Sequence, residues 1–229
     1  MKVLRELAFP AWMLACIAIA LWQHDVAWCA AGGLAGLGVR LALARGSWTP
    51  SGALGLANQI TLFRLAVIAA LPWLFAALPW FGFIALVIAL LILDGVDGSV
   101  ARSRGEASAF GAALDMETDA LCVMVLGILL WSHRLVGAWV LVAGLWRYAF
   151  ACAVALVPSL GEAPRTRFYR VVFVLLMICL AGAFVPWASF ANIAAGIGTA
   201  LVSISFIHSL ARSSAFGKPA MESAPPLNQ

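Results

Sequence analysis

The chain has 229 residues, of which 64% are hydrophobic and only 10% are charged, and its mean hydropathy is +1.02. Ordinary soluble domains carry roughly 25% charged residues, so a water-soluble fold is excluded and the composition predicts a protein solvated by the lipid bilayer. The net charge of +4 does not indicate a nucleic-acid partner, because the basic residues lie mainly in the connections on one side of the apolar segments. This distribution is typical of membrane topology.

Eight apolar segments are long enough, or nearly long enough, to cross a bilayer as helices. In chain order they lie at about residues 7–22, 26–44, 60–79, 81–101, 111–132, 135–157, 168–186 and 188–210. An even number of crossings places both termini on one side. Most Lys and Arg residues then fall near that side and the opposite side receives only Arg134, so the positive-inside rule assigns the termini to the cytoplasm. We expect an all-α polytopic protein, integral to a bacterial inner membrane.

The first segment has an alternative interpretation as a cleaved signal peptide, because Lys2 and Arg5 precede its hydrophobic run. The Trp-Gln-His-Asp stretch at 22–25 is a poor cleavage site, however, since such sites favour small residues. Loss of the segment would also upset the charge pattern. A retained transmembrane helix is therefore the preferred prediction.

Other features of the chain predict packing rather than chemistry. Gly32 and Gly36 have a spacing that permits close helix packing, which leaves a homodimer open. The five cysteines lie within apolar runs and form no CxxC pair, so we expect buried thiols rather than disulfides or a zinc site. The proline-containing segment 213–229 is expected to be a disordered tail.

Acidic residues are concentrated where the fourth apolar segment ends and the fifth begins. Six of the ten lie between positions 94 and 119. Carboxylates this close to hydrocarbon are costly unless they are paired, hydrated or bound to metal, so they indicate a functional site. Asp94 and Asp97 are three residues apart and share one helix face. Asp115 and Asp119 are four apart and share another, and a hairpin between the segments would bring the two faces together.

Four converging carboxylates form a hard oxygen cage that suits Mg²⁺ or Mn²⁺. Two such ions about 3.5–4 Å apart are a recurrent arrangement for displacement at phosphorus. Gly95, Gly98 and Gly111 would let a ligand approach the backbone closely. Arg102 would offer a forked donor to phosphate. The alternative is a set of interfacial ion pairs with Arg102 and Arg104, and the four-carboxylate pattern with its glycines favours the metal site.

These residues also form a recognisable motif. The run Asp94-Gly95-Val96-Asp97-Gly98-Ser99-Val100-Ala101-Arg102, followed by Gly111, Asp115 and Asp119, resembles the signature of the CDP-alcohol phosphatidyltransferase family, which is DxxDGxxAR, a spacer and GxxxDxxxD. Upstream, Asn58, Thr61 and Arg64 are similar to the NxxTxxR segment at the start of the family's first core helix. The resemblance implies a six-helix transferase core at 46–212, an additional N-terminal pair of transmembrane helices at 1–45 and the tail at 213–229.

The resemblance also implies roles for individual residues. Asp94, Asp97 and Asp115 would ligate two divalent cations, Mg²⁺ or Mn²⁺. Asp119 would contribute to the same metal site and would also act as the general base on the acceptor hydroxyl. The CDP part of the donor would be contacted by Gly98, Arg102 and Ser108, and its site would be closed by Asn58 and Thr61. The active site would face the cytoplasm.

The implied activity is transfer of a phosphatidyl group from CDP-diacylglycerol to a hydroxyl acceptor, such as glycerol 3-phosphate or another small polar alcohol, with release of CMP. The same motif also fits a donor that carries a CDP-linked head group, with diacylglycerol as the acceptor. Two rivals outside this class are a cation transporter and an inactive scaffold. A transporter is disfavoured because the acids gather at one end of two adjacent segments rather than at the midplane of repeated halves, and the intact motif disfavours the scaffold.

The acceptor is not defined by the motif. Two departures from the common family pattern, Ala120 after the last aspartate and Glu117 between the last two, leave its subclass open. Arg147 lies inside a predicted span and could bind an acceptor phosphate or pair with a carboxylate such as Glu117. A cluster at the cytoplasmic edge could bind a phosphorylated acceptor or contact anionic lipid headgroups, and it contains Arg165, Arg167 and Arg170.

Overall fold

The computed structural model describes residues 2–157 and 167–216, and within these ranges the chain forms helices and no strands. The elements are α1 (Lys2–Gln23), α2 (Ala27–Leu43), α3 (Leu56–Ala77), α4 (Trp80–Ser103), α5 (Ala109–Ser132), the short 3-10 helix η1 (Ala138–Val140), α6 (Leu141–Leu156), α7 (Arg167–Gly182) and α8 (Ala188–Phe216). The prediction of an all-α protein is confirmed.

The described helices have the lengths and compositions of membrane spans. Four helical segments are long and apolar enough to cross a bilayer, and they lie in α3, in α4, in η1 with α6, and in α8. Shorter apolar segments occupy Leu7–Gln23 of α1, α2 and Phe168–Gly182 of α7. Helix α5 is as long as α4, at 24 residues, but it carries three of the acidic residues near its start. The chain is an integral membrane protein.

Several helix boundaries differ from the expected ones by four or more residues, including the starts of α1 and α3 and the ends of α7 and α8. Helix α3 begins at Leu56 rather than near residue 60, directly after Gly55, whose φ of +74° is a conformation that favours glycine. Helix α8 continues to Phe216, past the expected boundary of the core at residue 212. The rest of the expected tail, 217–229, lies outside the described residues.

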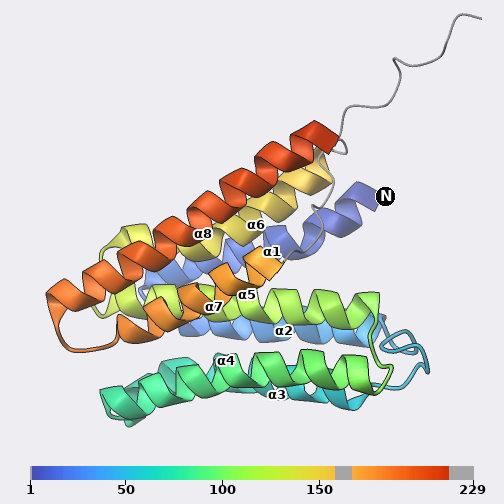
Figure 1. Ribbon diagram of the computed structural model, residues 1–229, viewed down its shortest axis with the longest axis horizontal. Helices are drawn as coiled ribbons and strands as arrows, with labels where there is room; N and C mark the ends of the chain where they lie inside the picture. The colour runs from blue at the N-terminus through green and yellow to red at the C-terminus, as the bar shows by residue number, and fades with distance from the viewer. Residues whose placement is uncertain (1, 158–166, 217–229) are drawn as a thin grey trace, which may run out of the picture.

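Helix α5 is the centre of the bundle. It packs against α2, α3, α6 and α7, and every residue from 120 to 130 is buried. Figure 1 shows α3 and α4 side by side along one edge of the molecule, with α2 and α5 next to them and α6 and α8 beyond. A helix that is buried on all sides can hold polar groups at a fixed depth, so α5 is a rigid support for the acidic residues in its first turns.

The N-terminal helix pair is integrated into this bundle. Helix α1 packs on α2 and α6, and α2 also contacts α3 and α5. The Gly32–Gly36 pair faces α1, because a Cβ atom built on Gly32 would lie 2.4 Å from Cys16 Sγ and one on Gly36 would lie 3.0 Å from Phe9. Trp12 Nε1 also donates a hydrogen bond to the Gly32 carbonyl at 2.9 Å. These glycines therefore serve packing within the chain and give no support to the homodimer that the sequence left open.

One end of the bundle gathers the segments that carry the motif. The start of α1, the α2–α3 connection, the α4–α5 connection and the end of α8 all lie at the right of Figure 1. Both ends of the helical region are thus on the same side as the acidic residues, as the even number of predicted crossings requires.

Candidate active site

The four aspartates converge from two antiparallel helices. Asp94 and Asp97 lie in the last turns of α4, and Asp115 and Asp119 lie in the first turns of α5. Carboxylate oxygens of Asp94, Asp97 and Asp115 all lie within 4.8 Å of one another. Asp97 is buried, whereas the other three side chains are between 19% and 32% exposed. The structure therefore agrees with the prediction that the two aspartate pairs lie on facing helix faces, and the four side chains form one cluster that is partly exposed.

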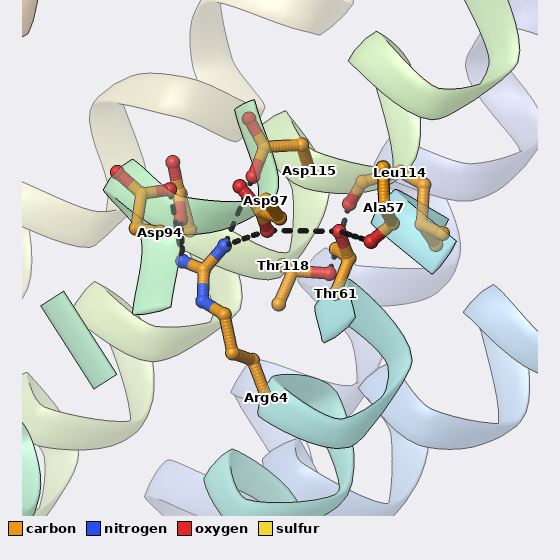
Figure 2. Close-up of polar contacts among 9 residues, drawn as sticks. Ala57, Thr61, Arg64, Asp94, Asp97, Leu114, Asp115 and Thr118 are labelled. Carbon is orange, nitrogen blue, oxygen red and sulfur yellow. Dashed lines mark hydrogen bonds and ion pairs between the residues drawn. The ribbon is translucent and has the colours of Figure 1, made fainter. Parts of the chain in front are cut away.

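Arg64 lies at the centre of this cluster. Its side chain rises from α3 and places its guanidinium among the carboxylates (Figure 2). Nη1 is 2.9 Å from Asp97 Oδ2 and 3.0 Å from Asp115 Oδ1. Nη2 is 3.0 Å from Asp94 Oδ1 and 2.6 Å from Asp119 Oδ1. Each terminal nitrogen thus contacts one carboxylate from α4 and one from α5. The arginine is only 3% exposed, so it is a built component of the site.

Thr61 supports the most buried of the four aspartates. It lies one turn before Arg64 on α3, and its hydroxyl donates a hydrogen bond to Asp97 Oδ2 at 2.9 Å. The Ala57 carbonyl, 3.2 Å away, is an alternative acceptor for the same hydroxyl. Asp97 Oδ2 accepts from both Thr61 and Arg64, so its orientation is defined from α3.

Asn58 and Ser108 hold the loop that precedes α3. Both donate to the carbonyl of Trp48, Asn58 Nδ2 at 3.1 Å and Ser108 Oγ at 2.6 Å. Ser108 Oγ is also the N-cap of α5, since it accepts from Gly111 N–H at 2.9 Å. A Cβ on Gly111 would lie 2.8 Å from Asn58 Oδ1. The motif glycine is therefore required for the close approach of α5 to α3, which sets the depth of Asp115.

A cavity of about 680 Å³ adjoins the aspartates between α4, α5, α6, α7 and α8. Its polar lining includes Asp94, Asp115, Asp119, Gly95, Gly98, Arg102, Arg147, Tyr169 and Arg170. Its apolar lining includes Leu91, Val123, Phe150, Phe173, Leu176 and Val202. Residues 91 and 123 lie further along α4 and α5 from the α4–α5 connection than the aspartates do. The apolar lining therefore extends from the acidic cluster toward the middle of the bundle.

The two glycines of the first motif half leave room at the cavity wall. A Cβ on Gly95 would meet nothing within 4 Å, and one on Gly98 would meet only the Arg102 guanidinium at 3.5 Å. Arg102 is exposed and makes no ion pair with any described residue. Its guanidinium is therefore available to an anionic ligand in the cavity.

Glu117 points away from the aspartate cluster. Its Oε1 is 2.8 Å from Arg147 Nη2 on α6 and 3.8 Å from Arg40 Nη1 on α2, and the carboxylate is buried. A rotation of about 200° from Asp115 on an α-helix accounts for this direction. The structure therefore agrees with the prediction that Arg147 pairs with a carboxylate such as Glu117. Arg147 also lines the cavity, and its Nε is buried without a hydrogen-bond partner among the described residues.

The other arginines expected at the acceptor site are only partly accounted for. Arg170, on α7, is exposed and lines the cavity. Arg167 begins α7, but its side chain and all of Arg165 lie outside the described residues. Asn58, Thr61 and Ser108, expected to contact the CDP group, do not belong to the described cavity lining, and their contacts run to protein groups.

Comparison with known protein families explains this arrangement. The family model described as CDP-alcohol phosphatidyltransferase matches residues 54–209, which is more than half of the chain. The chain belongs to this family. It is therefore an enzyme that transfers a phosphatidyl group from a CDP-alcohol to an alcohol acceptor. Searches of curated proteins and of solved structures found no match.

CDP-alcohol phosphatidyltransferases use a divalent metal, and the acidic cluster fits one. Carboxylate oxygens are the ligands that Mg²⁺ and Mn²⁺ prefer, and three aspartates place such oxygens within 4.8 Å of one another. The formal charge of the four carboxylates, −4, is only partly balanced by the +1 of Arg64. The remaining negative charge at the edge of a low-dielectric bundle favours binding of a cation.

Two residues of the site were not identified as such from the sequence. Arg64 belongs to the NxxTxxR segment, and the sequence alone assigns it no role at the metal site. The signal was its spacing from Asn58 and Thr61, which places all three on one helix face. Glu106 is one of the six acidic residues between positions 94 and 119, but it caps α3, since its Oε2 accepts from Ala57 N–H at 3.0 Å. No local pattern indicates a contact between residues 49 positions apart.

Proposed function

We propose that this transferase uses CDP-diacylglycerol as its donor and a small phosphorylated alcohol, such as glycerol 3-phosphate, as its acceptor. The products are a phospholipid and CMP, and the reaction takes place at the cytoplasmic face of a bacterial inner membrane. The observation that supports this is the cavity, which joins the acidic cluster and Arg102 to an apolar lining within one space of about 680 Å³.

The two kinds of lining match the two parts of the proposed donor. The diphosphate needs cations and close backbone approach, which the acidic cluster with its metal, Arg102 and Gly98 would supply. The acyl chains need apolar contact, which the lining deeper in the bundle offers. A donor with both parts in one molecule would fill both regions at once.

Metal ligation is proposed for Asp94, Asp97, Asp115 and Asp119. When bound, two divalent cations would neutralise charge on the attacking and leaving oxygens. Arg102 and Gly98 are proposed to contact the donor diphosphate from the cavity wall. We propose that Asn58, Thr61 and Ser108 support the nucleotide site without lining the cavity. Asn58 and Ser108 fix the starts of α3 and α5 through the Trp48 carbonyl, and Thr61 fixes the side chain of Asp97.

The proposed reaction is a direct displacement. The acceptor oxygen forms a bond to the phosphorus that carries diacylglycerol, the bond from that phosphorus to the CMP oxygen breaks, and Asp119 takes the proton of the acceptor hydroxyl. Asp119 lies on the cavity wall with its side chain 19% exposed, so it can reach a bound hydroxyl. Arg102 stabilises the negative charge on the departing CMP. Phosphoryl transfer requires positioning and charge neutralisation more than a covalent nucleophile.

The acceptor proposal is supported by the cationic part of the cavity. Arg147 and Arg170 both line it, and the Tyr169 hydroxyl oxygen, in the same lining, is buried without a partner among the described residues. Guanidinium and hydroxyl groups suit a phosphate on the acceptor. A donor with a CDP-linked choline-type head group, the alternative, would instead place a quaternary ammonium near two arginines, which is unfavourable.

The proposal is tested by CMP release from purified protein in nanodiscs with Mg²⁺ or Mn²⁺. CDP-diacylglycerol is offered with glycerol 3-phosphate, serine, inositol, inositol phosphate or choline, and CDP-choline is offered with diacylglycerol. We expect turnover with CDP-diacylglycerol and a phosphorylated acceptor. Asp97→Asn and Asp119→Asn should each lower the rate by roughly 10³-fold or more, because each removes a charge from the reaction centre.

A matched control is Asp25→Asn, which changes a carboxylate whose Oδ1 caps α2 at Ala27 N–H, away from the site. This variant should retain the wild-type rate, since asparagine also caps helices well. Turnover of CDP-choline with diacylglycerol, and none of CDP-diacylglycerol, would show that the donor assignment is wrong. Wild-type rates in Asp97→Asn or Asp119→Asn would contradict the proposed mechanism.

A further inference from the structure

Arg64 makes a set of contacts that differs from an ordinary ion pair. All four aspartates lie between 2.6 and 3.0 Å from its two terminal nitrogens. Nη1 bridges Asp97 of α4 and Asp115 of α5, and Nη2 bridges Asp94 and Asp119 in the same way. The guanidinium therefore links the two helices through the same carboxylates that are proposed as metal ligands (Figure 2).

The position of Arg64 is itself well defined. The side chain is buried among α3, α4 and α5 and its Nε makes no hydrogen bond to any described residue. A guanidinium cannot lose its charge in a protein, so Arg64 contributes a permanent positive charge to the cluster. Without that charge, four carboxylates would repel one another at the edge of a low-dielectric region.

We propose that Arg64 is a built-in counter-cation that competes with the metal for the aspartate oxygens and so sets the affinity for the metal. The inference rests on the proposed metal role of the four aspartates but not on the identity of donor or acceptor. In the metal-free protein Arg64 holds α4 and α5 together through the carboxylates. Metal ligation engages the same carboxylate oxygens, so each cation that binds weakens or replaces contacts of Arg64.

The competing explanation is that Arg64 is a structural anchor whose contacts are the same with and without metal, or that it holds the ligands in place for the metal. The two explanations differ in sign. By linkage, a group that stabilises the metal-free state more than the loaded state lowers metal affinity, and its removal makes binding tighter. Removal of a pure anchor leaves affinity unchanged, and removal of a group that holds the ligands in place makes binding weaker.

The test is Mn²⁺ titration of the full-length protein in detergent, with the loss of the free-Mn²⁺ electron paramagnetic resonance signal as the readout. Arg64→Gln removes the charge with a shorter polar side chain. We expect its Kd for Mn²⁺ to fall by roughly tenfold, within the range usual for coupled sites. The metal-free variant should also melt at a lower temperature than wild type, and saturating Mn²⁺ should raise its melting temperature by a larger increment.

Arg64→Lys gives a graded version of the test. It keeps the charge but replaces the fork with a point charge that cannot bridge both carboxylate pairs. Its Kd should lie between those of wild type and Arg64→Gln, and it carries the test if Arg64→Gln does not purify as a folded species. Unchanged or weaker Mn²⁺ binding in the folded variant would overturn the proposal.

Two controls separate this inference from the assignments on which it rests. Arg147→Gln removes a partly buried arginine, which pairs with Glu117 rather than with the aspartates, and should leave the Kd within about twofold of wild type. Asp97→Asn should abolish the tight Mn²⁺ binding, which shows that the titration reports this site. If wild-type protein binds no Mn²⁺, the metal role of the aspartates and the inference are both wrong, whatever the result of the CMP assay.

Discussion

At the scale of single residues, Glu106 shows how one carboxylate can tie two motif segments together. It lies in the connection between α4 and α5, and its Oε2 accepts a hydrogen bond from Ala57 N–H in the first turn of α3. The first N–H groups of a helix have no partner within it, and a negative charge there is favoured by the helix dipole. Arg104 Nε donates to the other oxygen at 3.0 Å. Glu106 thus holds α3, which carries Arg64, against the loop that follows Asp97.

This contact predicts a pH dependence of stability. The hydrogen bond from Ala57 N–H, with help from Arg104, holds the pKa of Glu106 below its ordinary value of 4.5. A carboxyl group whose pKa is lower in the folded than in the unfolded state stabilises the folded state at pH values above its unfolded-state pKa. This stabilisation is lost as the pH falls through the folded-state pKa. Glu106→Ala should therefore melt at a lower temperature than wild type at pH 7, and the difference should shrink progressively below pH 4.5.

The measurement is intrinsic fluorescence on heating, in detergent, across the pH range. Glu106→Gln keeps one acceptor oxygen and should lie between wild type and Glu106→Ala at pH 7. A difference between wild type and Glu106→Ala that is the same at pH 7 and at the lowest pH at which both proteins remain folded would show that the ionised carboxylate contributes nothing through this contact.

At the scale of elements, the crossing of α5 and α6 sets the width of the cavity. A Cβ on Gly144 would lie 2.8 Å from Met124 Cε and 2.9 Å from Met124 Cα. The second contact is to the backbone of a helix that is buried on all sides, so it cannot be relieved by a rotamer change of Met124 alone. Gly144 and Arg147 both belong to the cavity lining. A displacement of α6 would therefore move the acceptor side of the cavity relative to the aspartates on α5.

Gly144→Ala should destabilise the protein by about 1–3 kcal/mol, the usual cost of overpacking in a well-packed interior. It should also lower the rate of CMP release, because the cavity wall moves. Gly38→Ala is the matched control, since a Cβ on Gly38 would meet nothing within 4 Å and alanine is the better helix former. Chemical denaturation in mixed micelles measures both variants. Equal stability of the two would show that α5 and α6 can separate without cost.

At the scale of the whole molecule, the N-terminal helix pair lies outside the family match, which begins at residue 54, but inside the packed bundle. Met13 and Ile17 of α1 and Leu37 of α2 are at most 2% exposed. Leu121 of α5 fills the space beside Gly33, where a Cβ would lie 2.4 Å from its Cδ2. The pair therefore covers the face of α5 and α6 that does not line the cavity.

Removal of residues 1–45 should expose this face and leave Glu117 without its contact to Arg40. We expect a chain of residues 46–229 to aggregate in detergent and to release no CMP. Co-expression of residues 1–45 as a separate peptide should restore a monodisperse, active complex, because the helices pack through side chains that the cut leaves intact. Size-exclusion chromatography and the CMP assay measure both results. A stable, active truncated chain would show that the helix pair is a dispensable addition.

The helical class, the membrane environment and the acidic cluster follow from the sequence by itself. Their signals are local, since hydrophobic runs of span length define the helices and spacings of three and four residues place Asp94 with Asp97 and Asp115 with Asp119. The family motif is equally local. These features depend on residues within one or two helical turns of one another, so they can be read without knowledge of the tertiary packing.

Only the tertiary structure decided which residues meet across the bundle. Arg64 reaches aspartates 30 to 55 positions away, and Arg147 pairs with Glu117 from 30 positions away. Gly32 and Gly36 pack against α1 of the same chain. The sequence leaves such contacts undetermined, because many arginines, carboxylates and glycines lie at compatible depths in the membrane. The helix crossings select among them, since only the folded bundle defines which faces are turned toward one another.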